Sequence, residues 1–470
     1  MIKLKKKTVN FLITVFLISF FSFFITFNKF ISLSDNNIFI VIPILIFTFS
    51  IISYLLLVIS IPINFKSVKK FYLENQKILI PIIFLILLYF TLYLLTPIEN
   101  KSNSTLLNFF FKNEVLNNLI FKNYIIFFLI AFIFNIFLAK QLRVNESEIF
   151  SILLKFSIFF LLLAVVQNVI FFSNFTNISR YLTDTANCQY FQFLPFGHNG
   201  KRNYEIIPFL IGYALTLGVY KNKFIFTNII FFVVCFLTYS KNLWIAIIIL
   251  NFISIFIYDK FKVFKFFIIK ISTVSVIILF LNATFNIIKN CNPHIKDYTY
   301  IKILSLININ NHSIHLTELK KKSLSKMKSF QIYISYDGNK DHKKFINEVE
   351  FLLDSTKPRL YIYKESLKKI SEKKIFGHGH NNFILESNNS SNSESELLKI
   401  LLDIGIIGFL LWSYLIFQLL ISCKSKWSLL SVLSILSLSL FNIYSWFLPT
   451  YFILTFIIFF EKRVFNKSTL

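Results

Sequence analysis

Acidic residues, glycine, proline and cysteine are all scarce in this chain of 470 residues. Its 23 Asp and Glu stand against 49 Lys and Arg, and charged residues make up only 15% of it, whereas hydrophobic residues make up 56%. A soluble domain needs many more polar side chains to cover its surface. The shortage of charge therefore excludes a soluble core and predicts a membrane protein with several spans.

The four cysteines have a spacing that fits no metal site. Cys188 and Cys291 fall in loops that we place outside the cytoplasm, where a disulfide is chemically permitted. The sequence leaves open whether these two residues pair or are separate thiols.

Long apolar runs recur along the chain, and a helix needs about 20 apolar residues to cross the hydrocarbon core of a bilayer. By that measure the sequence predicts about twelve spans. The first is a retained span and not a signal peptide, because its apolar run is long and lacks a small-residue cleavage site. The spans are expected at 9–27, 38–63, 78–95, 123–139, 149–172, 205–220, 224–239, 243–258, 266–288, 397–421, 427–444 and 446–460.

The formal net charge of +26 raises the question of nucleic acid as a partner. If the N-terminus is cytoplasmic, however, each predicted inside loop is basic, as in "KLKKK", "DKFKVFK" and "EKRVFNK", and the short outside loops carry few positive charges. The positive-inside rule therefore predicts both termini in the cytoplasm and accounts for the charge without nucleic acid.

Two polar stretches, roughly 173–204 and 289–396, fall outside the membrane in this arrangement. A structureless connection as long as the second would be unusual, so we expect helices within it. The predicted fold is an all-α, polytopic transmembrane helix bundle with a large, partly helical extracytoplasmic loop. Residues 1–288 would form the first part of the bundle, 289–396 the periplasmic loop, and 397–470 the last spans and a cytoplasmic tail.

The stretch "TKPRLYIYKESLKKISEKKIFGHGH", at 356–380, has the pattern of a surface helix that ends in a turn. Pro358 suits a helix start, and Leu360, Tyr363, Leu367 and Ile370 recur at spacings of three and four, which predicts an apolar face lying on the bundle. Arg359 would then sit in the first turn. A helix N-terminus and a guanidinium both suit an anion, although a solvated surface Arg is the simpler interpretation.

Three further groups are candidates for chemistry. His378 and His380 lie in a Gly-His-Gly-His turn whose backbone can approach a ligand closely, although a loop that merely ends a helix would also contain them. Lys241 lies between two apolar spans, where it either has a function or extends to the headgroups. Lys201 and Arg202 form a small cationic patch before the span at 205–220.

Acidic residues gather where the span at 397–421 begins. Glu394 and Glu396 stand at its entry, where they would also favour the helix dipole, and Asp403 lies two turns inside it. Glu396 and Asp403 are seven residues apart, so both are expected on one helix face, directed toward the bundle.

The order of these elements is more specific than any one of them. "GHNGKRNYEIIPFLIGYAL", "LTYSKNLWIAIII", a large outer loop, "RLYIYKESLKKI" with "IFGHGHNNF", and "ESELLKILLDIGIIGFLLW" follow one another over roughly 190–415. This order resembles the O-antigen ligase and O-antigen polymerase superfamily of bacterial envelope enzymes. The strongest part runs from Arg359 through a helix to "FGHG", followed by "GIIG" in a span.

The resemblance implies a multi-pass glycosyltransferase of the bacterial inner membrane that acts at the periplasmic face without metal, nucleotide sugar or other cofactor. Its donor would be a glycan on undecaprenyl pyrophosphate, and an acceptor hydroxyl would attack the anomeric carbon with inversion. Arg359 matches the family's Arg that opens the loop helix, and Lys241 stands where the family usually has Arg. Arg202, with Lys201 beside it, is a regional match, and these cations would bind the pyrophosphate.

The sequence departs from the ligases at "SES", where they usually have His-Asn. Glu394 occupies roughly the place of that His, so the base is either Glu394, or His378 or His380 reaching in from the loop. The missing His-Asn favours a polymerase of O-antigen or related repeat units over a ligase that transfers the glycan to lipid A-core or another acceptor. A transporter or flippase of lipid-linked glycan is a further alternative, but the sequence shows no internal repeat to support it. Besides these substrates, membrane lipids are the expected partners.

Overall fold

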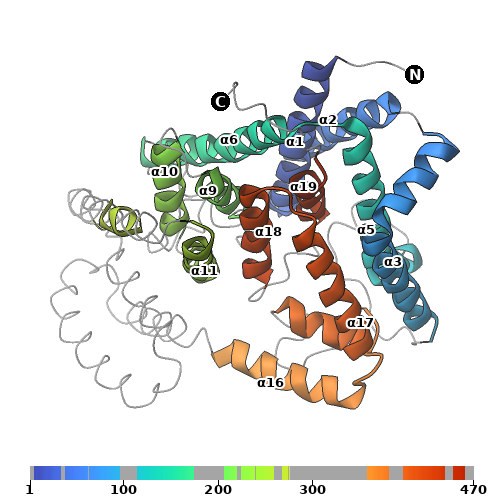
Figure 1. Cartoon of the computed structure of the whole chain (residues 1–470). Helices are drawn as coiled ribbons and strands as arrows, with labels where there is room; N and C mark the ends of the chain where they lie inside the picture. Colours follow the sequence, from blue (N-terminus) through green and yellow to red (C-terminus); the bar gives the residue numbers. More distant parts are fainter. Residues whose placement is uncertain are drawn as a thin grey trace, which may run out of the picture.

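The structure of the protein is a computed structural model that describes residues 5–32, 38–61, 63–95, 114–173, 206–219, 224–238, 240–258, 267–273, 275, 357–380, 395–439 and 448–460. Every secondary-structure element named in these ranges is an α-helix (Figure 1). The helices are α1 (Lys6–Ser32), α2 (Ile38–Ser60), α3 (Phe65–Leu95), α5 (Glu114–Leu142), α6 (Glu146–Ser173), α9 (Ile207–Val219), α10 (Ile225–Leu237), α11 (Lys241–Ile257), α16 (Lys357–Glu372), α17 (Glu396–Ile421), α18 (Lys426–Ser439) and α19 (Leu448–Ile458).

Five of the described helices contain a stretch long and apolar enough to cross a membrane. These stretches are Lys6–Phe23, Phe65–Leu95, Ile125–Leu142, Glu146–Val166 and Glu396–Ile421. Shorter apolar helices cover further predicted spans, whereas the segment predicted at 266–288 is described only at 267–273 and 275. The prediction of an all-α, polytopic chain agrees with the described helices, and the number of about twelve spans stays a prediction.

The core of the bundle is formed around α9, in which every residue from Ile207 to Gly218 is buried. α18 packs closely against it, and buried Ser428, Ser431, Ser434 and Ser437 recur at every third position of α18. Small side chains let two helix backbones approach each other in an apolar bundle. Three of these hydroxyls, those of Ser428, Ser434 and Ser437, donate to backbone carbonyls three residues earlier, as Ser434 Oγ does to the Ser431 carbonyl at 2.6 Å, whereas the buried Ser431 hydroxyl has no hydrogen-bond partner among the described residues.

At one end of the bundle lie the termini of several helices, which the sequence places on the same side of the membrane. Lys6 Nζ, near the start of α1, lies 3.0 Å from Glu148 Oε2 in the first turn of α6. The start of α18 joins this group: Lys426 Nζ donates to the Ile257 carbonyl at the end of α11, at 3.1 Å.

The first turn of α18 and the residues just before it make two further contacts at this end. Trp427 Nε1 donates to Glu146 Oε1 at 3.0 Å, and Lys424 Nζ donates to the Phe460 carbonyl after α19. A cation at the C-terminus of a helix complements the helix dipole. These ends therefore lie together, as the alternation of basic and less basic loops predicts for a single side.

The opposite end holds α16, which crosses the foot of the view in Figure 1, away from both chain termini. Beside it α17 changes direction, and Figure 1 shows one α17 segment next to α16 and a second that runs up toward α18. α17 also packs along α3, so the site described below is held between α3, α16 and α17.

We expect Gly218→Ala to destabilise the bundle. A Cβ at Gly218 would stand 2.2 Å from Trp427 Cα, which is backbone and cannot rotate away. Overpacking of this kind costs about 1–3 kcal/mol, more than the roughly 1 kcal/mol that Ala gains over Gly in a helix. Thermal unfolding of the detergent-solubilised protein should show a lower midpoint.

Lys364→Ala, at an exposed position of α16, is the control and should unfold at the wild-type midpoint. A Gly218→Ala protein that unfolds at the wild-type midpoint, or above it, would contradict the close contact between α9 and α18.

Candidate functional site

The site begins with a break in α17 at Gly405, whose φ of 62° and ψ of −163° are not helical. A positive φ is accessible to Gly at little cost and strained for other residues. The break follows Asp403 by two residues, so the segment from Glu396 to Asp403 is regular and presents both carboxylates to the interior. Glu396 and Asp403 are both buried, which confirms the shared face that their spacing predicts.

At this break, amides of the turn after α16 replace the helix amides that would otherwise bond to the carbonyls of α17. In an uninterrupted helix the carbonyls of Leu402 and Asp403 would accept hydrogen bonds from amides four residues further on. Here the Leu402 carbonyl accepts from the His378 amide at 2.7 Å, and the Asp403 carbonyl accepts from the Gly379 amide at 2.8 Å.

The amides released on the other side of the break are satisfied in the same way. Ile406 donates to the Lys374 carbonyl at 2.9 Å, and Ile407 donates to the Ile375 carbonyl at 3.3 Å. Buried backbone groups away from water need such partners. The turn at 374–379 and the break at 402–407 therefore complete each other's hydrogen bonds.

Glycine is required on both sides of this contact. A Cβ at Gly377, which has a φ of 72°, would lie 2.6 Å from the Asp403 carbonyl oxygen, and a Cβ at Gly405 would lie 2.3 Å from the Ile375 carbonyl oxygen. The Gly-His-Gly-His turn thus lets two backbones touch, as the sequence predicts for a close approach, but the partner in the described structure is α17 itself.

Three ionisable side chains meet beside the break. His380 Nδ1 lies 2.6 Å from Asp403 Oδ2, and Lys399 Nζ lies 3.0 Å from Asp403 Oδ1. The side chains of His380, Asp403 and Lys399 are only 2%, 0% and 4% exposed. Because a carboxylate only accepts hydrogen bonds, His380 donates through Nδ1, which fixes the orientation of its ring.

The surroundings of His380 set its charge. Burial lowers the pKa of His380 from 6.5, the neighbouring Asp403 carboxylate opposes this, and Lys399 adds to the lowering. Tyr89 of α3 meets the imidazole edge to face, with ring centroids 6.0 Å apart. The described contacts therefore favour a neutral imidazole held between α3 and α17.

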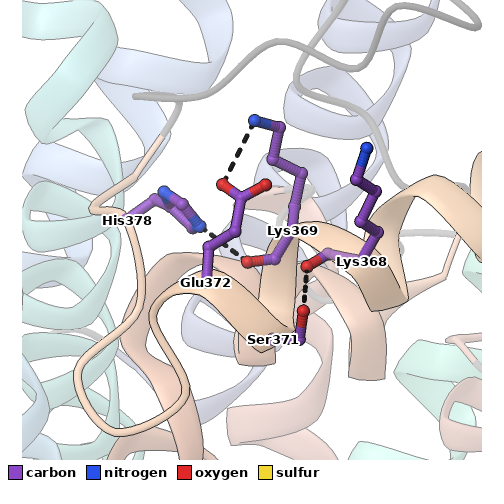
Figure 2. A network of polar contacts seen from close by, with 5 residues as sticks. All are labelled: Lys368, Lys369, Ser371, Glu372 and His378. Carbon is purple, nitrogen blue, oxygen red and sulfur yellow. Dashed lines mark hydrogen bonds and ion pairs between the residues drawn. The ribbon is translucent and has the colours of Figure 1, made fainter.

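His378 has a different environment, shown in Figure 2. Its Nε2 lies 2.9 Å from the carbonyl of Lys369, so Nε2 carries the proton and donates. The Lys369 side chain turns toward Glu372, with Nζ 3.2 Å from Oε2. His378 thus closes the C-terminal end of α16, whereas His380 reaches into α17.

The buried face of α16 differs in part from the predicted one. Ile362 packs against Leu402 of α17, with Tyr363 and Ile370 at the edge of this contact, but Leu367 is 56% exposed. The prediction for Leu367 is therefore wrong. The buried positions of α16 are Ile362 and Ser366, and Ser366 is the residue just before Leu367, so the buried face is turned by one residue from the predicted face. Arg359 lies about one turn before Ile362 in the same helix.

The other predicted site residues are described only in part. Arg359 lies in the first turn of α16 and Lys241 is the first residue of α11, but their side chains are outside the described residues, as are Lys201, Arg202 and Glu394 entirely. The possible pair of Cys188 and Cys291 also lies outside them. Whether these groups meet in one place thus stays a prediction.

Two buried lysines were missed by reasoning from the sequence. Lys399 precedes Asp403 by four residues, a spacing that pairs side chains on a helix and could have revealed it. Lys270 donates to the Tyr213 hydroxyl at 3.0 Å, and that hydroxyl donates to Asn251 Oδ1 at 2.9 Å. No local pattern in the sequence joins these three residues of different segments.

Metal ligation finds no support in the parts of the chain that the structure describes. Within those ranges, His, Cys, Asp and Glu side chains form no group of three or more that could hold a metal ion.

We expect the docked turn to loosen as the pH falls below 6.5. Because burial lowers the pKa of His380 from 6.5, an undocked turn binds a proton more readily than the docked one, and acidification therefore favours undocking. Hydrogen exchange of the amides at 377–380, corrected for its intrinsic pH dependence, should be slowest above pH 6.5 and faster below it. A His380→Asn control should lose this dependence, and protection that increases on acidification would contradict the assignment.

Comparison with known proteins gives a family match that covers this part of the chain. No curated protein matches the chain. Residues 226–413 match the family model described as O-Antigen ligase, and this range contains α16, the turn and the break in α17. The resemblance predicted from the sequence is confirmed, because this match is consistent with the O-antigen ligase and polymerase superfamily, and it supports an activity of that general type.

Proposed function

We propose that the protein is an inner-membrane glycosyltransferase that polymerises O-antigen or related repeat units carried on undecaprenyl pyrophosphate. The observation that carries this proposal is the family match over 226–413, which includes the helix opened by Arg359 and its docking on α17. Residues 1–288 and 397–470 would form the bundle, with 289–396 as the large outer loop.

The proposed orientation places the docked turn at the periplasmic face. The contacts from Lys6 to Glu148 and from Lys426 to Ile257 bring helix ends together whose loops are rich in Lys and Arg. By the positive-inside rule that end is cytoplasmic, with both termini. α16 is at the other end of the molecule and would therefore lie on the side where lipid-linked glycans are joined (Figure 1).

In the proposed reaction a hydroxyl of the acceptor glycan attacks the anomeric carbon of the donor. The new glycosidic bond forms as the bond from carbon to the pyrophosphate oxygen breaks, and undecaprenyl pyrophosphate leaves with that electron pair. Configuration at the anomeric carbon inverts, and the hydroxyl proton passes to a base. No cofactor is consumed in this scheme.

Negative charge grows on the leaving pyrophosphate, and fixed cations lower the energy of that transition state. Arg359 is the proposed principal ligand, because a guanidinium can grip a phosphate through two parallel hydrogen bonds. Lys241, Lys201 and Arg202 are the proposed supporting cations.

The proposed base is Glu394. It immediately precedes Ser395, the N-cap residue of α17, in the place where ligases usually have His. His378 and His380 are the alternative bases. The carbonyl contact of His378 and the carboxylate contact of His380 occupy one ring nitrogen of each, and both residues are buried, which favours Glu394.

A ligase is the second candidate, because the matching family model is described as O-Antigen ligase. It would transfer the finished glycan to lipid A-core or another acceptor with the same chemistry at the anomeric carbon. We prefer the polymerase because this chain has "SES" where ligases usually have His-Asn. A flippase of lipid-linked glycan would move the donor without releasing undecaprenyl pyrophosphate.

Deletion of the gene separates these functions. We expect lipopolysaccharide or surface glycan with single repeat units and no ladder of longer chains, because a polymerase is lost and attachment continues. Gel electrophoresis of the glycan checks this. Accumulation of full-length lipid-linked chains would instead identify a ligase, and the re-expressed wild-type protein is the control.

We expect Arg359→Ala to lower kcat of glycan transfer by about 10²–10³, the usual cost of removing one preorganised group that stabilises transition-state charge. Arg359→Lys should recover part of that loss, because it restores the charge without the two-pronged geometry. Lys364→Ala, an exposed lysine further along α16, is the matched control. Unchanged turnover in a correctly inserted Arg359→Ala protein would contradict the role of Arg359.

A further inference from the structure

The three buried side chains at the break in α17 join two segments that are distant in the sequence. His380 comes from the turn after α16, and Asp403 and Lys399 come from α17. Asp403 contacts both partners, one through each carboxylate oxygen, at 2.6 Å and 3.0 Å. One carboxylate oxygen is hydrogen-bonded to the imidazole and the other is in an ion pair with Lys399, so the carboxylate is held from both sides and holds the imidazole in one orientation.

Attachment alone does not explain this group. The backbones of 374–379 and 402–407 already exchange four hydrogen bonds, which are enough to dock the turn. Burying charges in an apolar bundle is costly, and apolar side chains of similar size are often at least as stabilising. The charged group therefore adds something other than attachment, namely a defined orientation of the turn on the helix.

That orientation determines how the two segments of the proposed active site lie. α16 begins at Lys357, with Arg359 in its first turn, and Ile362 of the same helix packs on Leu402. α17 begins at Glu396, two residues after Glu394. The contact between the turn at 377–380 and the segment at 399–403 therefore joins α16, which contains the proposed pyrophosphate ligand, to α17, which follows the proposed base.

We propose that Asp403 and Lys399 are positioning residues for glycan transfer, which act through His380 to fix α16 against the N-terminal segment of α17. This inference rests on the proposed function for its effect on catalysis. None of the three side chains touches substrate in this assignment: His380 is the link between the two helices, and it is not the base.

The first test separates orientation from stability. In the double variant Lys399→Met/Asp403→Asn no charge is left buried alone, so its thermal unfolding midpoint should match that of the wild type, whereas each single variant should unfold earlier. The double variant should still turn over about 10- to 100-fold more slowly, with little change in KM for the lipid-linked donor, because small misplacements of catalytic groups have effects of that size. Lys368→Met, an exposed lysine of α16, is the control and should behave as wild type.

Hydrogen exchange provides a readout that does not depend on activity. Amides at 377–380 should exchange about tenfold faster in the double variant than in the wild type, as expected for a turn whose opening has become easier. A double variant with wild-type turnover and wild-type exchange would overturn the proposal, because the charges would then be an ordinary ion pair.

A second pair of variants applies even if the double variant does not fold. His380→Asn can place an amide N–H where Nδ1 stands and keep the bond to Asp403, whereas His380→Ala cannot. We expect the Ala variant to turn over about tenfold more slowly than the Asn variant, because it alone loses this positioning contact. Equal, complete loss in both would show that His380 is the base and would overturn its positioning role.

Failure of the proposed function has a different signature. If wild-type protein transfers no glycan from undecaprenyl pyrophosphate, that function is wrong, whatever the variants do. Faster exchange at 377–380 in the double variant would still support the link between the two helices, and unchanged exchange would overturn it as well.

Discussion

The exchange of backbone hydrogen bonds between the turn at 374–379 and the break at 402–407 is the interaction on which the rest of the site depends. A helix broken inside a membrane protein must find new partners for its free carbonyls and amides, because lipid offers none. Here the turn supplies all four, and Gly377 and Gly405 make the approach possible by having no Cβ. The break in α17 and the turn after α16 are therefore one structural unit. Without the other segment, each would have buried backbone groups without hydrogen-bond partners.

Several charged side chains of this bundle make contacts between segments that are distant in the sequence. At one end, Lys424 just before α18 and Lys426 at its first position donate to carbonyls at the C-terminal ends of two helices, which ties the ends of α11 and α19 to the start of α18. At the other end, Asp403 holds Lys399 and His380 between α3, α16 and α17. Losing one partner of such a buried group costs about 3–5 kcal/mol, because the remaining charge has no solvent. An active site for a charged lipid pyrophosphate can use a rigid frame of this kind, since fixed cations act without reorganising.

Much of the fold was predictable from the sequence, because the periodicity and length of apolar runs determine helices directly. The runs that begin near 9, 38, 149 and 397 all coincide with described helices, and the shared face of Glu396 and Asp403 followed from their spacing. The break at Gly405 did not follow, because "GIIG" reads as an ordinary apolar stretch and its hydrogen-bond partners lie about 30 residues earlier. For the same reason the buried side of α16 was misplaced at Leu367. Lys270 and Tyr213 come from different segments, and only the folded bundle brings them together.

The central claim is that this chain forms a glycosidic bond at the expense of a bond to a lipid pyrophosphate. Purified protein in phospholipid vesicles, given a synthetic undecaprenyl-pyrophosphate-linked repeat unit, tests it most directly, with mass spectrometry of both products. The account predicts glycans extended by whole repeat units, with inverted configuration at the new bond, and one undecaprenyl pyrophosphate released for each bond formed. Donor that stays intact in the presence of correctly inserted protein, or that is only moved across the bilayer, would contradict it.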